Sequence, residues 1–181
     1  MIGNETTMWG ALNRDAIASL LAGDPPLLEE CPDLHSQLQS NGFDVTVRAV
    51  ASFTLAAGAG AIGVSDDDRA LPEPSRLRFG PDGWLDLGAG HYLVTFNEVV
   101  NLPRWLMALG RPRSSLLRMG VSLHTAVWDA GYSGRSQALL VVHNPAGFRL
   151  QRDARIAQLV FFPLNEPDDR GYDGRYQREN L

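Results

Sequence analysis

The sequence predicts a single all-β domain with one short helix near its N-terminus. Short apolar runs recur along the chain, and Gly, Pro, Asn or Asp bounds each of them, which is the pattern of strands joined by turns. Only residues 12–23 combine helical periodicity with helix-end signals. The 181 residues contain no internal repeat and no linker-like stretch. We therefore expect one domain, residues 1–181, with a sizeable core.

The predicted helix has a recognisable start, apolar face and end. Asn13 is a favourable N-cap, Ile17 and Leu20 lie on one face, and Gly23 is typical of the position just past a helix C-terminus. We expect residues 1–10, which precede it, to be a frayed terminus.

Strand-like patterns follow along the rest of the chain. They occur at residues 43–47, 84–87, 91–96, 105–109, 121–128, 138–144, 148–150 and 154–163. The Ala- and Gly-rich residues 50–64 indicate weak strands around a turn. Residues 65–83 contain three prolines and three consecutive aspartates, so we interpret them as a surface insertion loop.

Composition excludes several classes of protein. A formal charge of -5 and a pI near 5.3 argue against a general nucleic-acid binder. One cysteine, Cys31, excludes an intrachain disulfide framework and fits a reducing cytoplasm. Residues 1–10 lack the apolar segment of a signal peptide, and no apolar run is long enough to span a membrane. We therefore expect a cytoplasmic protein without nucleic-acid or membrane partners.

A cluster of arginines and serines precedes the predicted strand at residues 121–128. Arg111, Arg113, Ser114, Ser115 and Arg118 lie within eight residues. Arginine side chains hold phosphate oxygens through paired hydrogen bonds, and serine hydroxyls can fill the remaining oxygen positions. The cluster indicates a phosphate-binding turn, although its composition alone also fits a solvated loop.

A turn with one carboxylate and one aromatic ring follows that strand. It reads Asp129-Ala130-Gly131-Tyr132-Ser133-Gly134. An Asp in a Gly-rich turn is often only a turn former. Beside a phosphate-binding turn, however, it supplies the carboxylate and the ring that a nucleoside triphosphate site needs.

These two turns resemble the second and third motifs of the homotrimeric dUTP diphosphatase (dUTPase) and dCTP deaminase superfamily. Residues 112–115 match its Pro-Arg-Ser turn, and the Ser-Ser-x-x-Arg-x-Gly pattern at 114–120 is closer to the deaminase branch. Residues 129–132 match its Asp-x-Gly-Tyr element, and 155–158 match its Arg-Ile-Ala-Gln motif. The resemblance runs from about residue 11 to the tail, where 172–177 are similar to the closing Tyr-x-Gly-Lys-Tyr-Gln.

The resemblance implies a distorted jelly roll (β-clip, dUTPase-like) that forms a homotrimer with active sites between subunits. It implies that Asp129 orients or deprotonates a water, that Mg²⁺ bridges the phosphates, and that Asp44 lies near the metal. Tyr132 would stack on the deoxyribose. The implied substrate-binding residues are Arg113, Ser114, Ser115, Arg118, Tyr132, Gln158, Tyr172, Arg175, Tyr176 and Gln177. Such an enzyme clears dUTP from the nucleotide pool and supplies dUMP for dTTP synthesis.

The polar tail, residues 168–181, is expected to be a lid. Its composition alone indicates disorder, and we expect it to be too polar to fold on its own subunit. By resemblance, Arg175 replaces a lysine that faces the outer phosphates. Glu179 stands where the family often has glutamine, so its role stays open.

Three functions remain possible at this point. The first is hydrolysis of dUTP to dUMP and pyrophosphate. The second is a dCTP deaminase or a bifunctional enzyme, which resembles the framework but needs a Glu on the strand after the third motif. No acidic residue lies between Asp129 and Asp153, so we expect dUTP hydrolysis. The third is a noncatalytic nucleotide-binding trimer, against which the retention of Asp129 and of all five motifs argues.

Overall fold

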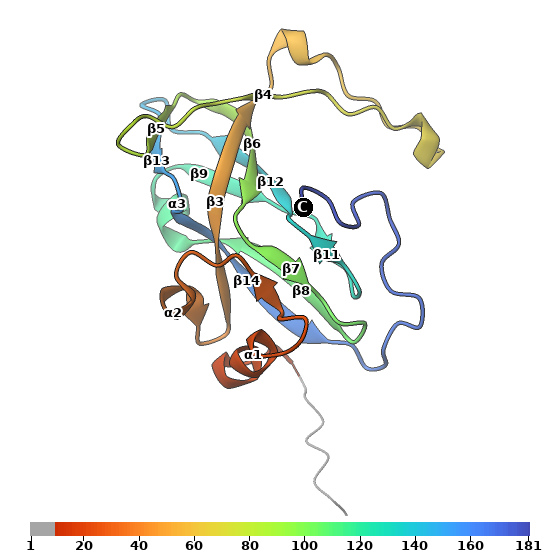
Figure 1. Ribbon diagram of the computed structural model, residues 1–181. Coiled ribbons are helices and arrows are strands. Elements are labelled where there is room, and N and C mark those ends of the chain that lie inside the picture. Colours follow the sequence, from red (N-terminus) through yellow and green to blue (C-terminus); the bar gives the residue numbers. More distant parts are fainter. Residues whose placement is uncertain (1–9) are drawn as a thin grey trace, which may run out of the picture.

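The structure, a computed structural model, describes residues 10–181 (Figure 1). The frayed terminus expected at residues 1–10 therefore lies, except for Gly10, outside the described residues. Antiparallel strands dominate and helices are few and short, which confirms the predicted all-β class. No helix in the described part of the chain is long and apolar enough to cross a membrane.

The elements are short and follow one another through turns, as the turn residues predict. In chain order they are α1 (Arg14–Leu21), β1 (Leu28–Glu29), α2 (Leu34–Gln37), β2 (Leu38–Gln39), β3 (Gly42–Ser52), η1 (Leu55–Ala57), η2 (Asp66–Asp68), β4 (Ser75–Arg76), β5 (Trp84–Leu87), β6 (Gly90–Phe96), β7 (Val99–Asn101), β8 (Leu106–Pro112), α3 (Ser114–Arg118), β9 (Val121–His124), β10 (Val127–Trp128), β11 (Ser133–Gly134), β12 (Gln137–Val142), β13 (Phe148–Gln151) and β14 (Arg155–Pro163). The predicted strands at 84–87, 91–96 and 148–150 agree with β5, β6 and β13 to within one residue.

The main sheet curls until its two edges approach each other. Its strands lie in the order β10-β8-β14-β3-β6-β12-β9, and β2 and β4 also pair with β3. β9 and β10 are at opposite ends of this order, yet only Thr125 and Ala126 separate them in the sequence. Three residue steps span at most about 11 Å. The sheet is therefore folded over in the manner of a jelly roll, and two small sheets, β1-β7-β11 and β13-β5, complete it.

The interior of this curled sheet holds the hydrophobic core. Phe43, Phe96, Leu140 and Phe161 are each at most 2% exposed. β12 is buried on both faces at its C-terminal half, as its continuous apolar run predicts. The predicted helix is also confirmed: the Asn13 side chain accepts a hydrogen bond from the Ala16 N–H at 2.9 Å, which caps α1.

The region between β3 and β5 differs from the prediction. β3 continues to Ser52, and residues 53–74 form an arm with two 3-10 turns and a single bridge between Ala61 and Ala70 (Figure 1). The weak strands expected at residues 50–64 are therefore wrong beyond Ser52, because small Ala and Gly side chains give a strand little to bury. The loop expected at residues 65–83 is also interrupted, because β4 lies within it and pairs with β3.

A buried polar network ties β3 to the segment before β7. The Glu98 carboxylate is 0% exposed and accepts three hydrogen bonds, from Gln37 Nε2 at 2.6 Å, Thr46 N at 3.0 Å and Thr46 Oγ1 at 2.6 Å. Asn97 extends the network from Thr46 to the Asp153 carboxylate. Burial raises the pKa of Glu98, and its hydrogen bonds oppose that rise. The network fixes the middle of β3, next to its register shift between Val47 and Ala49 and close to the site described below.

We expect Glu98→Gln to lower the free energy of unfolding by about 1–3 kcal/mol. The new amide would bring donors to a place where all three partners already donate. Chemical denaturation measures the change. Glu166→Gln, which alters an exposed carboxylate, is the matched control and should be neutral. Equal stability of the two variants would contradict the assigned role of Glu98.

Candidate functional site

The predicted phosphate-binding turn lies between β8 and α3. The Arg113 N–H donates to the Ile156 carbonyl at 3.0 Å, which fixes the turn to β14. Leu116 is buried and anchors α3, whereas Ser114 and Ser115 are exposed on its first turn. The two hydroxyls are therefore free to meet a ligand, as the prediction requires.

Asp44 holds the arginine of this turn. Its carboxylate is nearly buried, and Oδ2 lies 3.3 Å from Arg113 Nε and 3.5 Å from Arg155 Nη1. Burial raises the pKa of Asp44, and the two guanidinium groups act in the opposite direction. The carboxylate is engaged by two cations, so it orients Arg113 and would influence a metal only through that arginine.

Gln158 lies beside Asp44 on the neighbouring strand. β14 pairs Gln158 with Asp44 of β3 on one side and with Arg111 of β8 on the other. A Cβ at Gly42 would lie 2.3 Å from the Leu159 carbonyl oxygen and 2.9 Å from Gln158 Cγ. Glycine is therefore needed at position 42 for the strands and this side chain to fit. We call Asp44, Arg113, Ser114, Ser115 and Gln158 the phosphate cluster.

Arg118 has a structural contact in addition to its predicted one. Its Nη1 donates to the Ser114 carbonyl at 3.2 Å, across one turn of α3. This hydrogen bond helps to hold the short helix together. The side chain is also exposed and borders the phosphate cluster. Its contact with substrate stays a prediction.

Asp129 borders a cavity that is separate from the phosphate cluster. A cavity of about 170 Å³, here called the Asp129 cavity, lies between the turn after β10, the start of β12 and the tail. Its lining residues are Ala126, Val127, Trp128, Asp129, Tyr132, Ser136, Gln137, Tyr172, Tyr176 and Glu179. The Asp129 side chain is exposed, so its carboxylate is open to water and to a ligand.

Tyr132 forms one wall of this cavity through a chain of hydrogen bonds. Trp128 Nε1 donates to Ser136 Oγ, which lies 3.0 Å from the Tyr132 hydroxyl, and that hydroxyl donates to Glu179 Oε1 at 3.0 Å. The Tyr132 and Tyr172 rings pack edge to face, with their centroids 5.8 Å apart. Burial raises the pKa of Tyr132 and also that of Glu179. The ring is thereby fixed in place, and its stacking on deoxyribose stays a prediction.

The tail folds against its own chain. Gln177 Nε2 donates to the Gly131 and Tyr172 carbonyls at 2.9 and 3.0 Å, and its Oε1 accepts from the Ser133 N–H at 2.8 Å. Gly131 has a φ of 86°, and a Cβ there would lie 2.9 Å from the Gly171 Cα. The expectation that the tail is too polar to fold on its own subunit is therefore wrong: hydrogen bonds hold it, and Tyr172 packs against the core and the Tyr132 ring.

Arg135 holds the last residues of the tail. Its N–H donates to the Glu179 carbonyl at 2.9 Å, its Nε donates to the Asn180 carbonyl at 3.2 Å, and Asn180 Nδ2 donates back to the Arg135 carbonyl at 2.9 Å. Glu30 pairs with the buried guanidinium at 2.8 Å. These contacts keep Glu179 inside the Asp129 cavity.

The other predicted tail residues lie in two different places. Tyr172 and Tyr176 line the Asp129 cavity, and the Tyr176 N–H lies 3.4 Å from the Tyr172 hydroxyl. Arg175 is exposed and donates to the Arg69 carbonyl of the arm at 3.3 Å. Within one chain Arg175 thus contacts the arm, and its contact with phosphates stays a prediction.

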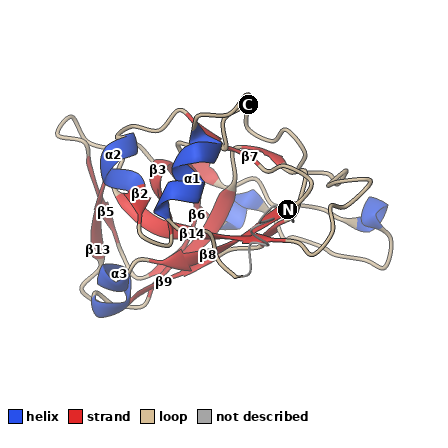
Figure 2. Cartoon of the chain, turned by 90° about the horizontal axis from the view of Figure 1, so that it is seen from below, coloured by secondary structure: helices blue, strands red, loops and turns tan. Residues whose placement is uncertain are grey.

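One chain does not bring the phosphate cluster to the Asp129 cavity. β10 pairs Trp128 with Ala108 of β8, whereas Arg113 lies five residues further along that strand direction. At about 3.3 Å per residue, the backbone of Arg113 is about 16 Å along the strand from the level of Trp128. In Figures 1 and 2, α3 is likewise well separated from β7, which pairs with β11 beyond the Asp129 turn.

Several contributors to the site escape sequence reasoning. Arg155 belongs to the recognised fourth motif, but its ion pair with Asp44 depends on the register of two strands. Ser136, Trp128 and Arg135 carry no local signal of their hydrogen bonds. Glu179 had only one indication, its position in the last motif where the family often has glutamine.

Comparisons with known proteins agree with the motifs. Residues 12–164 match the dCTP deaminase-like family. The "Probable deoxyuridine 5'-triphosphate nucleotidohydrolase" of Methanosarcina mazei is 47% identical over 169 residues, which are 93% of this chain and 97% of that protein. The protein of the same name from Archaeoglobus fulgidus is 44% identical over 170 residues, which are 94% and 97% of the two chains.

A solved structure shows the same fold. The 2'-deoxycytidine 5'-triphosphate deaminase of Agrobacterium tumefaciens superposes with a TM-score of 0.62 at 24% sequence identity. The match covers 86% of this chain and 49% of the deaminase chain, so this chain spans about half the length of that protein.

Proposed function

Since this chain belongs to the dCTP deaminase-like family, we propose that it is a dUTP diphosphatase, which hydrolyses dUTP to dUMP and pyrophosphate. Five relatives that carry the corresponding name are 44–47% identical over at least 93% of this chain. At that similarity and coverage the catalytic residues are expected to be shared.

The Asp129 cavity carries the proposal. It presents an exposed carboxylate, and the β12 residue that lines it is Gln137, whose Nε2 donates to Thr95 Oγ1 at 3.0 Å. A deaminase must move protons onto a leaving amine, which an amide side chain does poorly. Hydrolysis at the α-phosphorus needs only a base and groups that hold the phosphates.

The residues divide the work in a simple way. Asp129 accepts a proton from a water that attacks the α-phosphorus in line with the leaving group. The bond from the α-phosphorus to the bridging oxygen breaks, so pyrophosphate leaves with that oxygen and dUMP gains the oxygen of water. Arg113, Ser114 and Ser115 hold the phosphates, and Gln158 donates its amide to them.

Mg²⁺ is proposed as the cofactor. Among residues 10–181, no three His, Cys, Asp or Glu side chains group as a metal site. This donor set fits an ion carried mainly by the triphosphate, since Mg²⁺ takes substrate oxygens and few protein ligands in such sites. Bound there, it would neutralise phosphate charge. Asp44 would act on it only through Arg113.

Glu179 keeps dCTP deamination, alone or with hydrolysis, as the second candidate. Its carboxylate lies in the Asp129 cavity, and burial raises its pKa above that of an exposed glutamate. It enters from the tail rather than from β12, where the family's acid lies, and it is already bonded to Tyr132. Hydrolysis of dUTP needs no acid in place of the missing β12 glutamate, so it is the better-supported function.

The substrate assay is direct. With Mg²⁺, the purified protein should release pyrophosphate from dUTP, with dTTP and UTP poor substrates. Discrimination is expected from Tyr132, which excludes a 2′-hydroxyl, and from backbone groups between Val121 and Tyr132. Equal turnover of UTP and dUTP would contradict this placement of the sugar.

We further propose a homotrimer in which a second chain supplies the phosphate cluster to each Asp129 cavity. The separation of about 16 Å along β8 supports this arrangement. The arm at residues 53–74 supports association as well, because Leu55, Ile62 and Val64 are 104%, 83% and 107% exposed. Three such exposed apolar side chains within ten residues favour a contact surface.

Light scattering should therefore give about three times the 19.8 kDa of one chain. Replacing Leu55, Ile62 and Val64 by serine is expected to weaken assembly and lower turnover together. Ser substitution of Leu34, which is exposed on α2 and lies outside the arm and the phosphate cluster, is the control. A monomer with full activity at the assay concentration would refute the trimer.

A further inference from the structure

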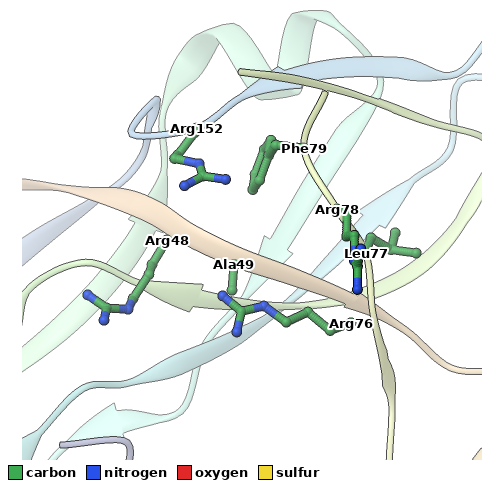
Figure 3. Close-up of a pocket in the computed structure, with 7 residues that line it drawn as sticks. All are labelled: Arg48, Ala49, Arg76, Leu77, Arg78, Phe79 and Arg152. Atoms are coloured by element: carbon green, nitrogen blue, oxygen red, sulfur yellow. The ribbon is translucent and has the colours of Figure 1, made fainter. Parts of the chain in front are cut away.

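A second cavity lies away from both groups of site residues and is lined by arginines. It has a volume of about 500 Å³, and its lining residues are Arg48, Ala49, Arg76, Leu77, Arg78, Phe79 and Arg152. None of them belongs to the phosphate cluster or to the Asp129 cavity. Figure 3 shows Arg76 extended past Ala49 toward Arg48, with Arg152 lying beside Phe79. We call it the arginine cavity.

The arginine cavity is assembled from three segments of the chain. Arg48 comes from β3, Arg76 and Arg78 come from β4 and the residues after it, and Arg152 comes from the turn before β14. The Arg152 guanidinium lies 5.1 Å from the centre of the Phe79 ring, a cation–π contact that holds it in place. The fold thus collects four cations that are distant in sequence.

These cations lack matching acids around the cavity. Among the residues that the structure describes, no acidic side chain lines it. Of these four arginines, only Arg48 forms an ion pair with a described residue, Glu30 at 3.4 Å, and Glu30 is also bound by Arg135 at 2.8 Å. All four arginines are exposed, so solvent screens part of their mutual repulsion, and an anion bound among them would offset the rest.

The chemistry of the lining defines the ligand class. Guanidinium groups bind phosphate oxygens bidentately, and several of them around one hollow suit a ligand with many such oxygens. The volume is that of a small-molecule site and exceeds what one phosphate group needs. We propose that the arginine cavity binds a di- or triphosphate anion, as free pyrophosphate or as the phosphate chain of a nucleoside triphosphate.

The test measures binding of pyrophosphate to the full chain by equilibrium dialysis. Wild type is compared with the Arg76→Ala/Arg78→Ala double variant, and the control is Arg149→Ala, an exposed arginine paired with Asp86 at 2.7 Å. Charge-assisted hydrogen bonds predict at least a tenfold loss of affinity, roughly, at one site per chain in the double variant. The control should bind as wild type does. Arg152→Ala, from a different segment, should reproduce the loss.

Additional arms identify the source of the anion. Tripolyphosphate and dTTP are titrated in parallel: equal affinity indicates that the phosphate chain alone is recognised, and tighter binding of dTTP indicates a nucleotide. Turnover of dUTP without added pyrophosphate should be near normal in the double variant, so failure of this proposal is distinct from failure of the proposed function. Unchanged stoichiometry and affinity for pyrophosphate in the double variant and in Arg152→Ala would overturn the proposal. Binding of a single-stranded oligonucleotide without any binding of pyrophosphate would also overturn it.

Discussion

Asp129→Asn is expected to lower turnover of dUTP by roughly 10²-fold or more, the usual scale for loss of a general base. The amide keeps the size and hydrogen bonding of the side chain but cannot accept the proton of the attacking water. Because Asp129 is exposed at the mouth of its cavity, the substitution should leave folding intact. Nucleotide binding should persist, which titration calorimetry with a non-hydrolysable dUTP analogue measures.

The matched control is Asp173→Asn, which removes an exposed carboxylate from the nearby tail. It changes the net charge equally and should retain near-normal turnover. Near-normal turnover in Asp129→Asn would remove Asp129 from the catalytic role. Equal losses in both variants would indicate a general electrostatic effect instead.

Deleting residues 172–181 is expected to lower turnover by roughly 10²-fold, since small displacements of a positioned group have effects of that size. The deletion removes Tyr172, Tyr176 and Glu179 from the wall of the Asp129 cavity. It also removes the Gln177 hydrogen bonds that hold the Asp129 turn. Steady-state kinetics on the truncated enzyme would measure the loss.

Two single substitutions separate the contributions of the tail. Gln177→Ala keeps every side chain that lines the cavity and removes only the contacts with Gly131, Ser133 and Tyr172, so it tests positioning. Arg175→Ala tests the predicted contact with the outer phosphates and should raise KM for dUTP. An intact rate after truncation would reduce the tail to a segment without catalytic use.

The motif residues could be predicted because each depends on a short stretch of chain. The Pro-Arg-Ser turn, the Asp-x-Gly-Tyr turn and the position of Gln158 follow from local order along the sequence. Their partners could not be predicted, since the pairing of Asp44 with Arg155 and the fit of Gly42 against Leu159 depend on the register of β3 and β14.

Two errors show where local patterns lose information. Residues 121–128 form an apolar run that fits one strand, yet the chain leaves the sheet edge at Thr125 and Ala126 and joins the opposite edge as β10. Periodicity reports which faces are buried and not which strand is the partner. The tail was misjudged for a related reason, because backbone and amide hydrogen bonds dock it where composition predicted disorder.

The central claim is best tested by supplying dUTP and dCTP separately to the purified protein with Mg²⁺ and measuring both pyrophosphate and ammonia. The structure places an exposed carboxylate, that of Asp129, and an amide, that of Gln137, at the same cavity. The account therefore predicts pyrophosphate from dUTP and no ammonia from dCTP. Ammonia from dCTP at a rate comparable to dUTP hydrolysis would contradict it, and loss of that ammonia in Glu179→Gln would identify Glu179 as the acid responsible.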